Sequence, residues 1–255
     1  MDVDSRHADP GRDVHVVWWR FDAAAPGRLA AFERWLSAAE HLRMARFRFE
    51  KDRVQFLASR ILLRHTLAAA TREPAASLRF STDDHGTKPR LVAGPDDAAV
   101  APPPVHFSLT HTSVLVACAL TRSGEVGLDA EAWSRQVQVE ALASRVLSSR
   151  EADQLNALPV EARPRRFLEY WTVKEAWLKA MGTGLRVSPS SIEVDGERDP
   201  VWRVRLLDTC PDHVVALVWP RVTDGGCEPR VYVRAFELPP SPDAPERPSA
   251  VAGGL

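Results

Sequence analysis

The sequence predicts an α+β protein made of two halves, each a small antiparallel sheet packed with helices. Apolar residues alternate in some short segments, as in strands, and recur every three or four positions in longer ones, as in helices. The order of these segments, a strand followed by helices and then more strands, occurs once before residues 122–125 and again after them. No residue-level repeat accompanies this order, so the two halves are inferred from the order alone.

The first half is expected to begin with a strand at residues 15–20, a run of valines and tryptophans after His15. Two helices are predicted next, at residues 28–49 and 53–71, from their helical apolar spacing. Three consecutive prolines at 102–104 mark a loop. The remaining strands of this half are predicted at residues 78–81, 105–109 and 114–120.

The second half is expected to repeat the order, beginning with a strand that ends at Glu131. Its helices are predicted at residues 138–146, 149–157 and 164–181, and its later strands at 191–195, 201–207, 213–219 and 231–236. Five prolines within residues 239–248 predict a disordered end. The expected units are therefore an N-terminal half (1–123), a C-terminal half (124–240) and a Pro-rich tail (241–255).

Composition restricts the classes of function. The chain has 255 residues, with 33 basic and 34 acidic side chains and a formal charge of −1, which disfavours nucleic-acid binding. The longest apolar run, Val114 to Leu120, is far shorter than the roughly 20 residues that cross a bilayer. The first ten residues include Asp2, Asp4, Arg6, His7 and Asp9 and have no apolar run, so no secretory signal is expected, and the three cysteines show no pairing pattern. These features predict a cytoplasmic protein that binds neither nucleic acid nor membrane.

The basic residues are unevenly divided: 29 are Arg and only 4 are Lys, namely Lys51, Lys88, Lys174 and Lys179. Codon bias in a GC-rich genome explains the total. It also means that this chain uses Arg wherever any cation suffices. A retained Lys therefore points to chemistry that requires an ammonium group.

The segment Val126-Gly127-Leu128-Asp129-Ala130-Glu131 carries two carboxylates on one face of a predicted strand, because side chains alternate between faces. Asp129 and Glu131 then share their face with Gly127, which is expected to leave space there. Paired carboxylates suit a hard cation such as Mg²⁺. The solvated face of an edge strand gives the same pattern, so the segment alone leaves both interpretations open.

The segment from Phe167 to Leu185 has helical periodicity and ends at two glycines, Gly182 and Gly184. Trp171, Glu175 and Lys179 are successive i, i+4 neighbours along one side of this helix. An ordinary surface ion pair would explain the pair of Glu175 and Lys179. The surrounding aromatic residues, and the presence of two of the four lysines, indicate a functional site instead, and the segment alone leaves both interpretations open.

Three further segments offer anion contacts. Phe107-Ser108-Leu109-Thr110-His111-Thr112-Ser113 places a histidine among hydroxyls, which can bind phosphate or cap the turn between two strands. His85-Gly86-Thr87-Lys88-Pro89 sets a lysine beside Gly and Pro. Arginines at positions 43, 46, 53, 60 and 64 form either a solvated basic face or a phosphate-binding row.

Together these segments resemble the 4′-phosphopantetheinyl transferases of the larger, Sfp-like class. The matching motifs are Gly86-Thr87-Lys88-Pro89, Phe107 to Thr112, Val126 to Glu131 and Trp171-Thr172-Val173-Lys174-Glu175-Ala176-Trp177-Leu178-Lys179. The resemblance spans about residues 15–236 and includes three of the four lysines. It departs from the family pattern mildly: Thr110 and Thr112 stand where Ser is frequent, Ala130 separates the carboxylates, and the basic positions of the first half align poorly.

The resemblance implies a fold of two pseudo-twofold-related halves and a monomer with its site between them. The implied reaction transfers the phosphopantetheine arm of coenzyme A to a serine of an acyl or peptidyl carrier protein and releases adenosine 3′,5′-bisphosphate. Such carriers serve fatty-acid, polyketide or nonribosomal-peptide synthesis.

The resemblance also implies roles for individual residues. Asp129, Glu131 and Glu175 would bind Mg²⁺, for which Mn²⁺ could substitute, and Glu175 or a bound water would be the base. Lys179 would stabilise the transferring phosphate. The implied contacts to coenzyme A are Lys88, Thr110, His111 and Lys174, with Arg43, Arg46 and Arg60 at its phosphates.

Two other functions share part of this pattern. A metal-dependent phosphodiester hydrolase acting on similar substrates would use the same three carboxylates with water as the nucleophile. A non-catalytic protein that binds coenzyme A would not need the full set of carboxylates and lysines that this chain retains.

Overall fold

The computed structural model describes residues 13–21, 26–82, 89–92, 105–194, 199–221 and 228–243. Lys88 and residues 1–12 and 244–255 are outside this described part. The strands are β1 (Val14–Arg20), β2 (Arg79–Thr82), β3 (Pro89–Val92), β4 (His106–His111), β5 (Leu115–Thr121), β6 (Gly127–Ala132), β7 (Trp202–Leu207), β8 (His213–Pro220) and β9 (Val231–Ala235). The α-helices are α1 (Pro26–Ala30), α2 (Ala38–Ala45), α3 (Glu50–Thr71), α4 (Val139–Val146), α5 (Ser149–Asn156) and α6 (Arg163–Met181).

Two sheets form the centre of the molecule. The first has the strand order β4-β5-β1-β9, and the second has the order β6-β8-β7. All neighbours in them are antiparallel except β1 and β9, which run parallel with Val14 opposite Val231. A separate hairpin pairs β2 with β3. The mixture of helices with small, mainly antiparallel sheets confirms the predicted α+β class.

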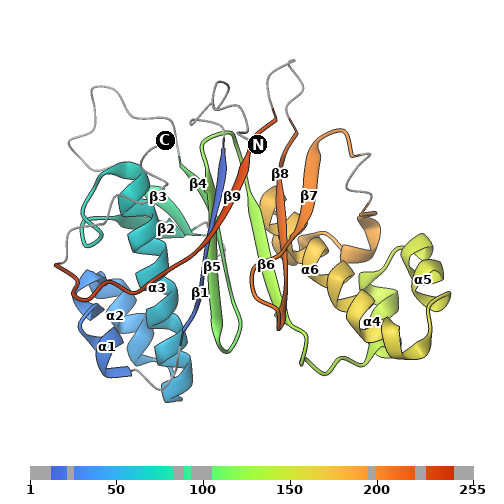
Figure 1. The fold of residues 1–255 in the computed structure, drawn as a ribbon, viewed down its shortest axis with the longest axis horizontal. Coiled ribbons are helices and arrows are strands. Elements are labelled where there is room, and N and C mark those ends of the chain that lie inside the picture. The colour runs from blue at the N-terminus through green and yellow to red at the C-terminus, as the bar shows by residue number, and fades with distance from the viewer. Residues whose placement is uncertain are drawn as a thin grey trace, which may run out of the picture.

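The two central sheets face each other and share one apolar core. Val16 and Ala117 from the first sheet are fully buried against Leu128 and Leu217 from the second. As Figure 1 shows, α1 to α3 cover the outer side of the first sheet, while α4 to α6 lie on the outer side of the second. Burial of this inter-sheet layer stabilises the packing of the two halves, at about 25 cal/mol per Å² of apolar surface.

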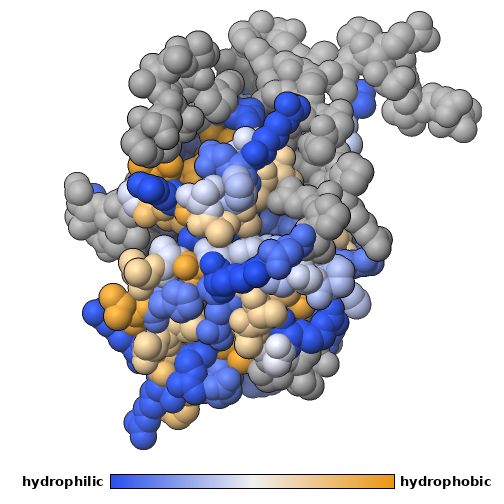
Figure 2. Space-filling model, turned by 90° about the vertical axis from the view of Figure 1, so that its left-hand side faces the viewer, coloured by the Kyte–Doolittle hydropathy of each residue, from blue (hydrophilic) through white to orange (hydrophobic). Residues whose placement is uncertain are grey.

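Helix α3 is the main support of the first sheet. Its first turn carries Glu50 and Asp52, which favour a helix N-terminus, and it ends where Arg72 adopts a left-handed conformation with φ of 63°. Its apolar face packs on Val116 and Leu120 of β5. Figure 2 shows hydrophilic residues interspersed with smaller hydrophobic areas on the outer face of this helical layer, as expected for amphipathic helices.

Helix α6 supports the second sheet. Pro164 stands in its first turn, where a missing amide hydrogen costs nothing, and Gly182 ends it with φ of 66°. Ala176 and Ala180 face Ala216 and Val218 of the sheet. Small side chains on this face let the helix lie close to the strands.

Several predicted elements are wrong in detail. The helix predicted at 28–49 is broken into α1, a short 3₁₀ turn and α2, because Ser37 and Glu40 form a capping box that starts a new helix. The strand predicted at 191–195 is wrong for its described part, where a 3₁₀ turn (Pro189–Ser191) is followed by irregular chain. Strand β3 was not predicted.

The expected extent of the C-terminal half also needs one correction. Strand β9 falls in the range 124–240 but pairs with β1, in the sheet of the N-terminal half. Its hydrogen-bonding partners are therefore more than 200 residues earlier in the chain. Of the predicted tail 241–255, only residues 241–243 are described, and Asp243 there forms an ion pair with Arg34.

Candidate active site

Strand β6 places its carboxylates as its alternation predicts. Val126, Leu128 and Ala130 are buried in the core between the sheets, and Asp129 and Glu131 point to the opposite face, toward α6. Asp129 is buried, and its Oδ1 accepts a hydrogen bond from Thr110 Oγ1 of β4 at 3.2 Å. Glu131 forms an ion pair with Arg135.

Gly127 does not leave an open space on this face, contrary to the expectation. The backbone of α6 occupies that position: a Cβ atom on Gly127 would lie 1.8 Å from the carbonyl oxygen of Ala176 and 2.7 Å from the amide nitrogen of Ala180. Glycine is required here because the helix approaches the strand backbone closely. This approach brings the last turns of α6 beside Asp129.

Lys179 contacts β6 directly. Its Nζ lies 2.7 Å from Asp129 Oδ1 and 3.0 Å from the carbonyl oxygen of Leu128. The side chain is about one third exposed, whereas that of Asp129 is mostly buried. The ion pair therefore joins two elements and is not the ordinary i, i+4 surface pair that the helical spacing allowed.

The carboxylates of this region repel one another. Burial raises the pKa of Glu175, and the nearby charge of Asp129 raises it further, against the opposing effects of Lys179 and Arg135. Burial likewise raises the pKa of Glu131; Arg135 opposes this rise, and Asp129 and Glu175 add to it. These carboxylates are held near one another although their negative charges repel. Their oxygen atoms suit a hard divalent cation, which would relieve the repulsion. The oxygens of the three carboxylates do not all lie within 4.8 Å of one another, so such an ion would draw them together.

A cavity of about 660 Å³ lies next to these residues and is walled by both halves of the molecule. Glu175 and Lys179 of α6 line one side, and His111, Phe56, Arg43 and Arg60 line the other. Asp129 and Glu131 are not on the wall itself, and Asp129 adjoins the cavity through Lys179. The cavity combines cationic groups, an aromatic ring and a carboxylate, as a site for a large anionic ligand would.

His111 ends β4 at the rim of this cavity. Its side chain is exposed, yet the protein packed on its other side lowers its pKa, and the positive charge of Lys179 lowers it further. The ring is therefore neutral near pH 7. A neutral imidazole can donate one hydrogen bond to a phosphate oxygen.

Of the three arginines predicted to contact phosphates, Arg43 and Arg60 line the cavity and Arg46 does not. Arg60 lies 3.7 Å from Glu40 and stacks over Phe56, with its guanidinium carbon 5.1 Å from the ring centre. Burial lowers its pKa, although the group stays charged at neutral pH. Arg43 also stacks over Phe56, at 5.6 Å. Arg46 is exposed at the end of α2 and is not among the residues that line the cavity.

Lys174 is not brought into this site. Its side chain is 1% exposed and lies 2.6 Å from Glu151 of α5. The ammonium also donates to the carbonyl oxygens of Pro189 and Ile192, at 2.9 and 2.7 Å. With its ammonium held by a carboxylate and two carbonyls, Lys174 has a structural role, and the expectation of a contact to coenzyme A is corrected for this residue.

Two residues that were assigned no role of their own from the sequence, Ser108 and Gln55, position the site. Ser108 Oγ accepts a hydrogen bond from the amide of Leu128 at 3.0 Å and so fixes β4 against β6. Gln55 of α3 donates to the carbonyl oxygen of Thr112, next to His111. Ser108 had a signal in the sequence, since Ser108 and Thr110 are two residues apart and so share one face of a strand, and the structure buries both.

Two family models match the chain side by side. The model described as the 4′-phosphopantetheinyl transferase superfamily matches residues 125–219, and that described as 4′-phosphopantetheinyl transferase, N-terminal, matches residues 24–123. These matched regions meet at the predicted junction between the halves. In addition, no described helix is both long enough and apolar enough to span a membrane.

Curated relatives agree with these models. The chain is 33% identical to the 4′-phosphopantetheinyl transferase HetI of Nostoc sp. over 68% of its own length and 70% of the relative. It is 30% identical to a phosphopantetheinyl transferase of Thraustochytrium sp., over 87% of this chain and 82% of the relative. For the 4′-phosphopantetheinyl transferase Sfp of Bacillus subtilis, the identity is 26% over 70% of this chain and 74% of the relative. The predicted resemblance is confirmed, and the chain belongs to the 4′-phosphopantetheinyl transferase superfamily.

Proposed function

We propose that this enzyme transfers the 4′-phosphopantetheine arm of coenzyme A to a serine hydroxyl of an acyl or peptidyl carrier protein and releases adenosine 3′,5′-bisphosphate. One observation carries the proposal: the ion pair of Lys179 and Asp129 lies beside a cavity walled by both halves. A site of this kind offers positive charge, carboxylates and room for a large anionic substrate together. Phosphoryl transfer requires the first two to be placed at the reacting phosphate.

In this proposal Asp129, Glu131 and Glu175 bind Mg²⁺, and Mn²⁺ can substitute for it. The oxygen donors and the raised pKa values of Glu131 and Glu175 support the assignment, because a cation would offset their repulsion. When bound, the metal supplies Lewis acidity to the pyrophosphate oxygens. Arg135 and Lys179, which now contact two of the carboxylates, would shift toward the substrate or solvent.

The substrate contacts come from the first half. His111, Arg43 and Arg60 line the cavity and are proposed to hold the phosphates of coenzyme A. Phe56, over which both arginines stack, gives the adenine ring an apolar neighbour. Thr110 is proposed to act through Asp129, to which it donates a hydrogen bond. Arg46, which does not line the cavity, and Lys88, which lies outside the described residues, are also proposed to contact phosphates of coenzyme A.

The chemistry assigned to the protein's own groups is a direct displacement. The carrier serine oxygen bonds to the phosphorus that bears the pantetheine arm, and the bond from that phosphorus to the bridging oxygen breaks, with adenosine 3′,5′-bisphosphate as the leaving group. Glu175, or a water it holds, takes the serine proton as the general base. Lys179 stabilises the charge that develops on the non-bridging oxygens.

We further propose that the enzyme acts as a monomer in the cytoplasm, since residues of both halves of one chain wall the cavity. Cys118 and Cys210, the free cysteines of the described part, are compatible with a reducing compartment.

The experiment combines the purified protein with coenzyme A, Mg²⁺ and a panel of apo carrier proteins, each followed by intact mass. Transfer adds one phosphopantetheine to a carrier, and EDTA should abolish it. Asp129→Ala should abolish transfer while keeping the melting temperature, whereas Asp153→Ala, an exposed acid on α5, serves as the control. Free phosphopantetheine released without any carrier would instead indicate a hydrolase, and near wild-type rates for Asp129→Ala at limiting Mg²⁺ would remove Asp129 from the ligand set.

A further inference from the structure

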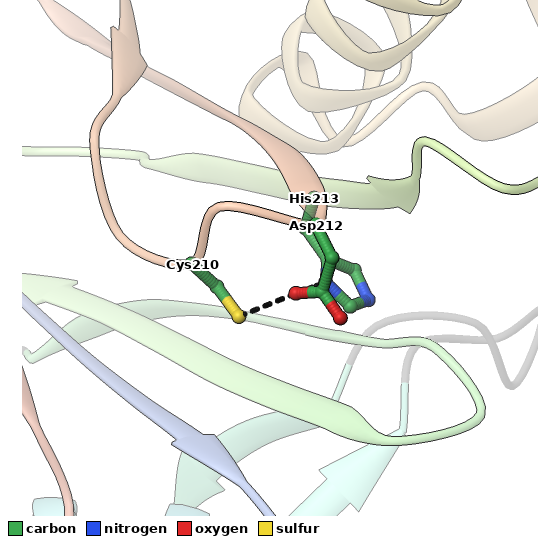
Figure 3. A group of neighbouring side chains, drawn as sticks. All are labelled: Cys210, Asp212 and His213. Carbon is green, nitrogen blue, oxygen red and sulfur yellow. Dashed lines mark hydrogen bonds and ion pairs between the residues drawn. The ribbon is translucent and has the colours of Figure 1, made fainter.

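A second cluster of metal-binding side chains lies at the turn between β7 and β8, apart from the carboxylates of β6 and α6. Cys210, Asp212 and His213 each offer one donor atom there, and these sulfur, oxygen and nitrogen atoms all lie within 4.8 Å of one another. Figure 3 shows the thiol of Cys210 pointing at the carboxylate of Asp212, with the ring of His213 beside it. Among the described residues, these three are the His, Cys, Asp or Glu side chains whose donor atoms lie this close to one another as a group.

The present hydrogen bonds converge on a single oxygen. The Cys210 thiol donates to Asp212 Oδ1 at 2.8 Å, and His213 Nδ1 lies 2.9 Å from the same atom. Arg20 is paired with the other carboxylate oxygen, Oδ2, at 2.8 Å. Arg20 therefore orients the carboxylate, and Oδ1 faces the thiol and the imidazole.

The ring of His213 is held from its other side as well. Its Nε2 lies 3.0 Å from Thr112 Oγ1, in the turn between β4 and β5. That hydroxyl already accepts the amides of Leu115 at 3.1 Å and Val114 at 3.4 Å, so its own hydrogen is directed to Nε2. In the arrangement that fits these contacts, Nε2 accepts from Thr112 and Nδ1 carries a hydrogen that it donates to Asp212.

A metal ion can take the place of two hydrogens: the one between Cys210 Sγ and Asp212 Oδ1, and the one between His213 Nδ1 and Asp212 Oδ1. Tetrahedral zinc separates sulfur and oxygen ligands by about 3.5 Å, and nitrogen and oxygen ligands by about 3.3 Å. The present separations of 2.8 and 2.9 Å need to widen by less than about 1 Å. The Asp212 side chain is 44% exposed and can rotate to allow this, while Cys210 and His213 are buried.

We propose that Cys210 Sγ, Asp212 Oδ1 and His213 Nδ1 bind one zinc ion, with water as the fourth ligand. A thiolate, an imidazole and one carboxylate suit zinc, whereas Mg²⁺ prefers the all-oxygen set of β6 and α6. Binding releases the thiol proton of Cys210 and moves the ring hydrogen of His213 from Nδ1 to Nε2. Thr112 Oγ1 then accepts that hydrogen in place of the long bond from Val114, which is the kind of partner that orients a metal-bound histidine.

The test titrates the EDTA-treated, desalted full-length protein with Co²⁺, a spectroscopic substitute for zinc, and follows the thiolate-to-cobalt absorption band. We expect one equivalent of Co²⁺ to give this band, zinc to displace it, and excess Mg²⁺ to leave it unchanged. Cys210→Ser should lose the band, whereas Cys118→Ser, which removes a buried thiol in β5, and Cys227→Ser should retain it. Asp212→Asn should weaken Co²⁺ binding at least tenfold.

Melting curves of each variant distinguish loss of the site from loss of the fold, and Asp212→Asn, at a half-exposed position, is the variant expected to fold in any case. Asp129→Ala should keep the Co²⁺ band, which separates this site from the proposed Mg²⁺ site. Absence of a thiolate band in the folded wild-type protein would overturn the proposal. Retention of the band in Cys210→Ser, or its displacement by Mg²⁺, would overturn it equally.

Discussion

Lys179 reaches across from α6 to β6, where its Nζ lies 2.7 Å from Asp129 Oδ1. Glu175 lies one helical turn earlier on α6. The charge of Asp129 raises its pKa, and the charge of Lys179 lowers it. The ammonium of Lys179 is thus paired with the carboxylate of β6 and acts on that of α6 through its charge. It is held in place by a second acceptor, the Leu128 carbonyl at 3.0 Å.

This geometry predicts that Lys179→Arg lowers kcat by at least about tenfold, which corresponds to about 1.4 kcal/mol in the barrier. The guanidinium is broader and planar, so it fits poorly where the ammonium must approach a non-bridging phosphate oxygen and misplaces charge at the transferring phosphate. Lys51→Arg, at an exposed position of α3, is the matched control. Carrier modification kinetics and melting curves decide it: an unchanged kcat for Lys179→Arg would mean that the ion pair is only structural.

The close packing of α6 on β6 makes a second prediction, for Gly127→Ala. The new methyl group would lie 1.8 Å from the Ala176 carbonyl oxygen, a separation that backbone atoms cannot accept without moving the helix. Overpacking at buried sites costs about 1 to 3 kcal/mol and more where backbone must move. Gly27→Ala, with nothing within 4 Å of the new atom, is the control. Equal unfolding free energies for the two variants in urea would contradict this account.

Asp129 and its ion-pair partner Lys179 show which features of the site could be predicted from the sequence. Alternation along β6 was enough to place Asp129 and Glu131 on one face, because a strand has a fixed period of two. Helical spacing placed Glu175 and Lys179 on one side of α6. The contact between Lys179 and Asp129 was beyond prediction from spacing, because it depends on how closely α6 approaches Gly127.

Only those features of the fold that depend on residues close together in the sequence could be predicted. Strand β9 has an apolar pattern of its own, but its parallel partner β1 lies at the other end of the chain, and no local pattern encodes that pairing. Strand β3 is four residues long and begins with proline, which is too short for a period to be recognised. The break before α2 did have a signal, the capping box of Ser37 and Glu40, and the apolar spacing across it masked that signal.

A third prediction concerns the buried ion pair of Lys174 and Glu151. Lys174→Met should lower the free energy of unfolding by about 3 to 5 kcal/mol, because Glu151 would stay buried without its cation. Replacing both residues, as Lys174→Met with Glu151→Gln, should recover part of this loss, because the buried negative charge is removed and the one amide oxygen of Gln can keep one of the two bonds from the backbone amides of Ser148 and Val194. The KM for coenzyme A, measured where each variant is folded, should change little. A large rise in KM with unchanged stability would return Lys174 to the substrate site.

The last prediction is a pH dependence of stability that originates at His65. This residue of α3 lies beside a cavity of about 830 Å³ together with Arg234 and Phe236, and its ring packs edge-on against Phe236 at 5.0 Å. Burial, together with the smaller effect of the positive charge of Arg234, lowers the pKa of His65 from 6.5 to about 4. The folded protein therefore keeps this ring neutral at a pH where the unfolded chain binds a proton on it.

The sign of the effect follows from where that proton binds. Above about pH 7 neither state is protonated at His65, so the residue contributes no pH dependence. As the pH falls from about 6.5 to about 4, the unfolded state gains the proton first, and the free energy of unfolding decreases by at most about 3 kcal/mol.

His65→Gln removes the titrating group, so the free energy of unfolding of this variant should fall less steeply over this range than that of the wild type. Urea unfolding at closely spaced pH values measures the difference, with His41→Gln on α2 as the control; parallel curves for wild type and His65→Gln would show that His65 is not held neutral in the folded protein.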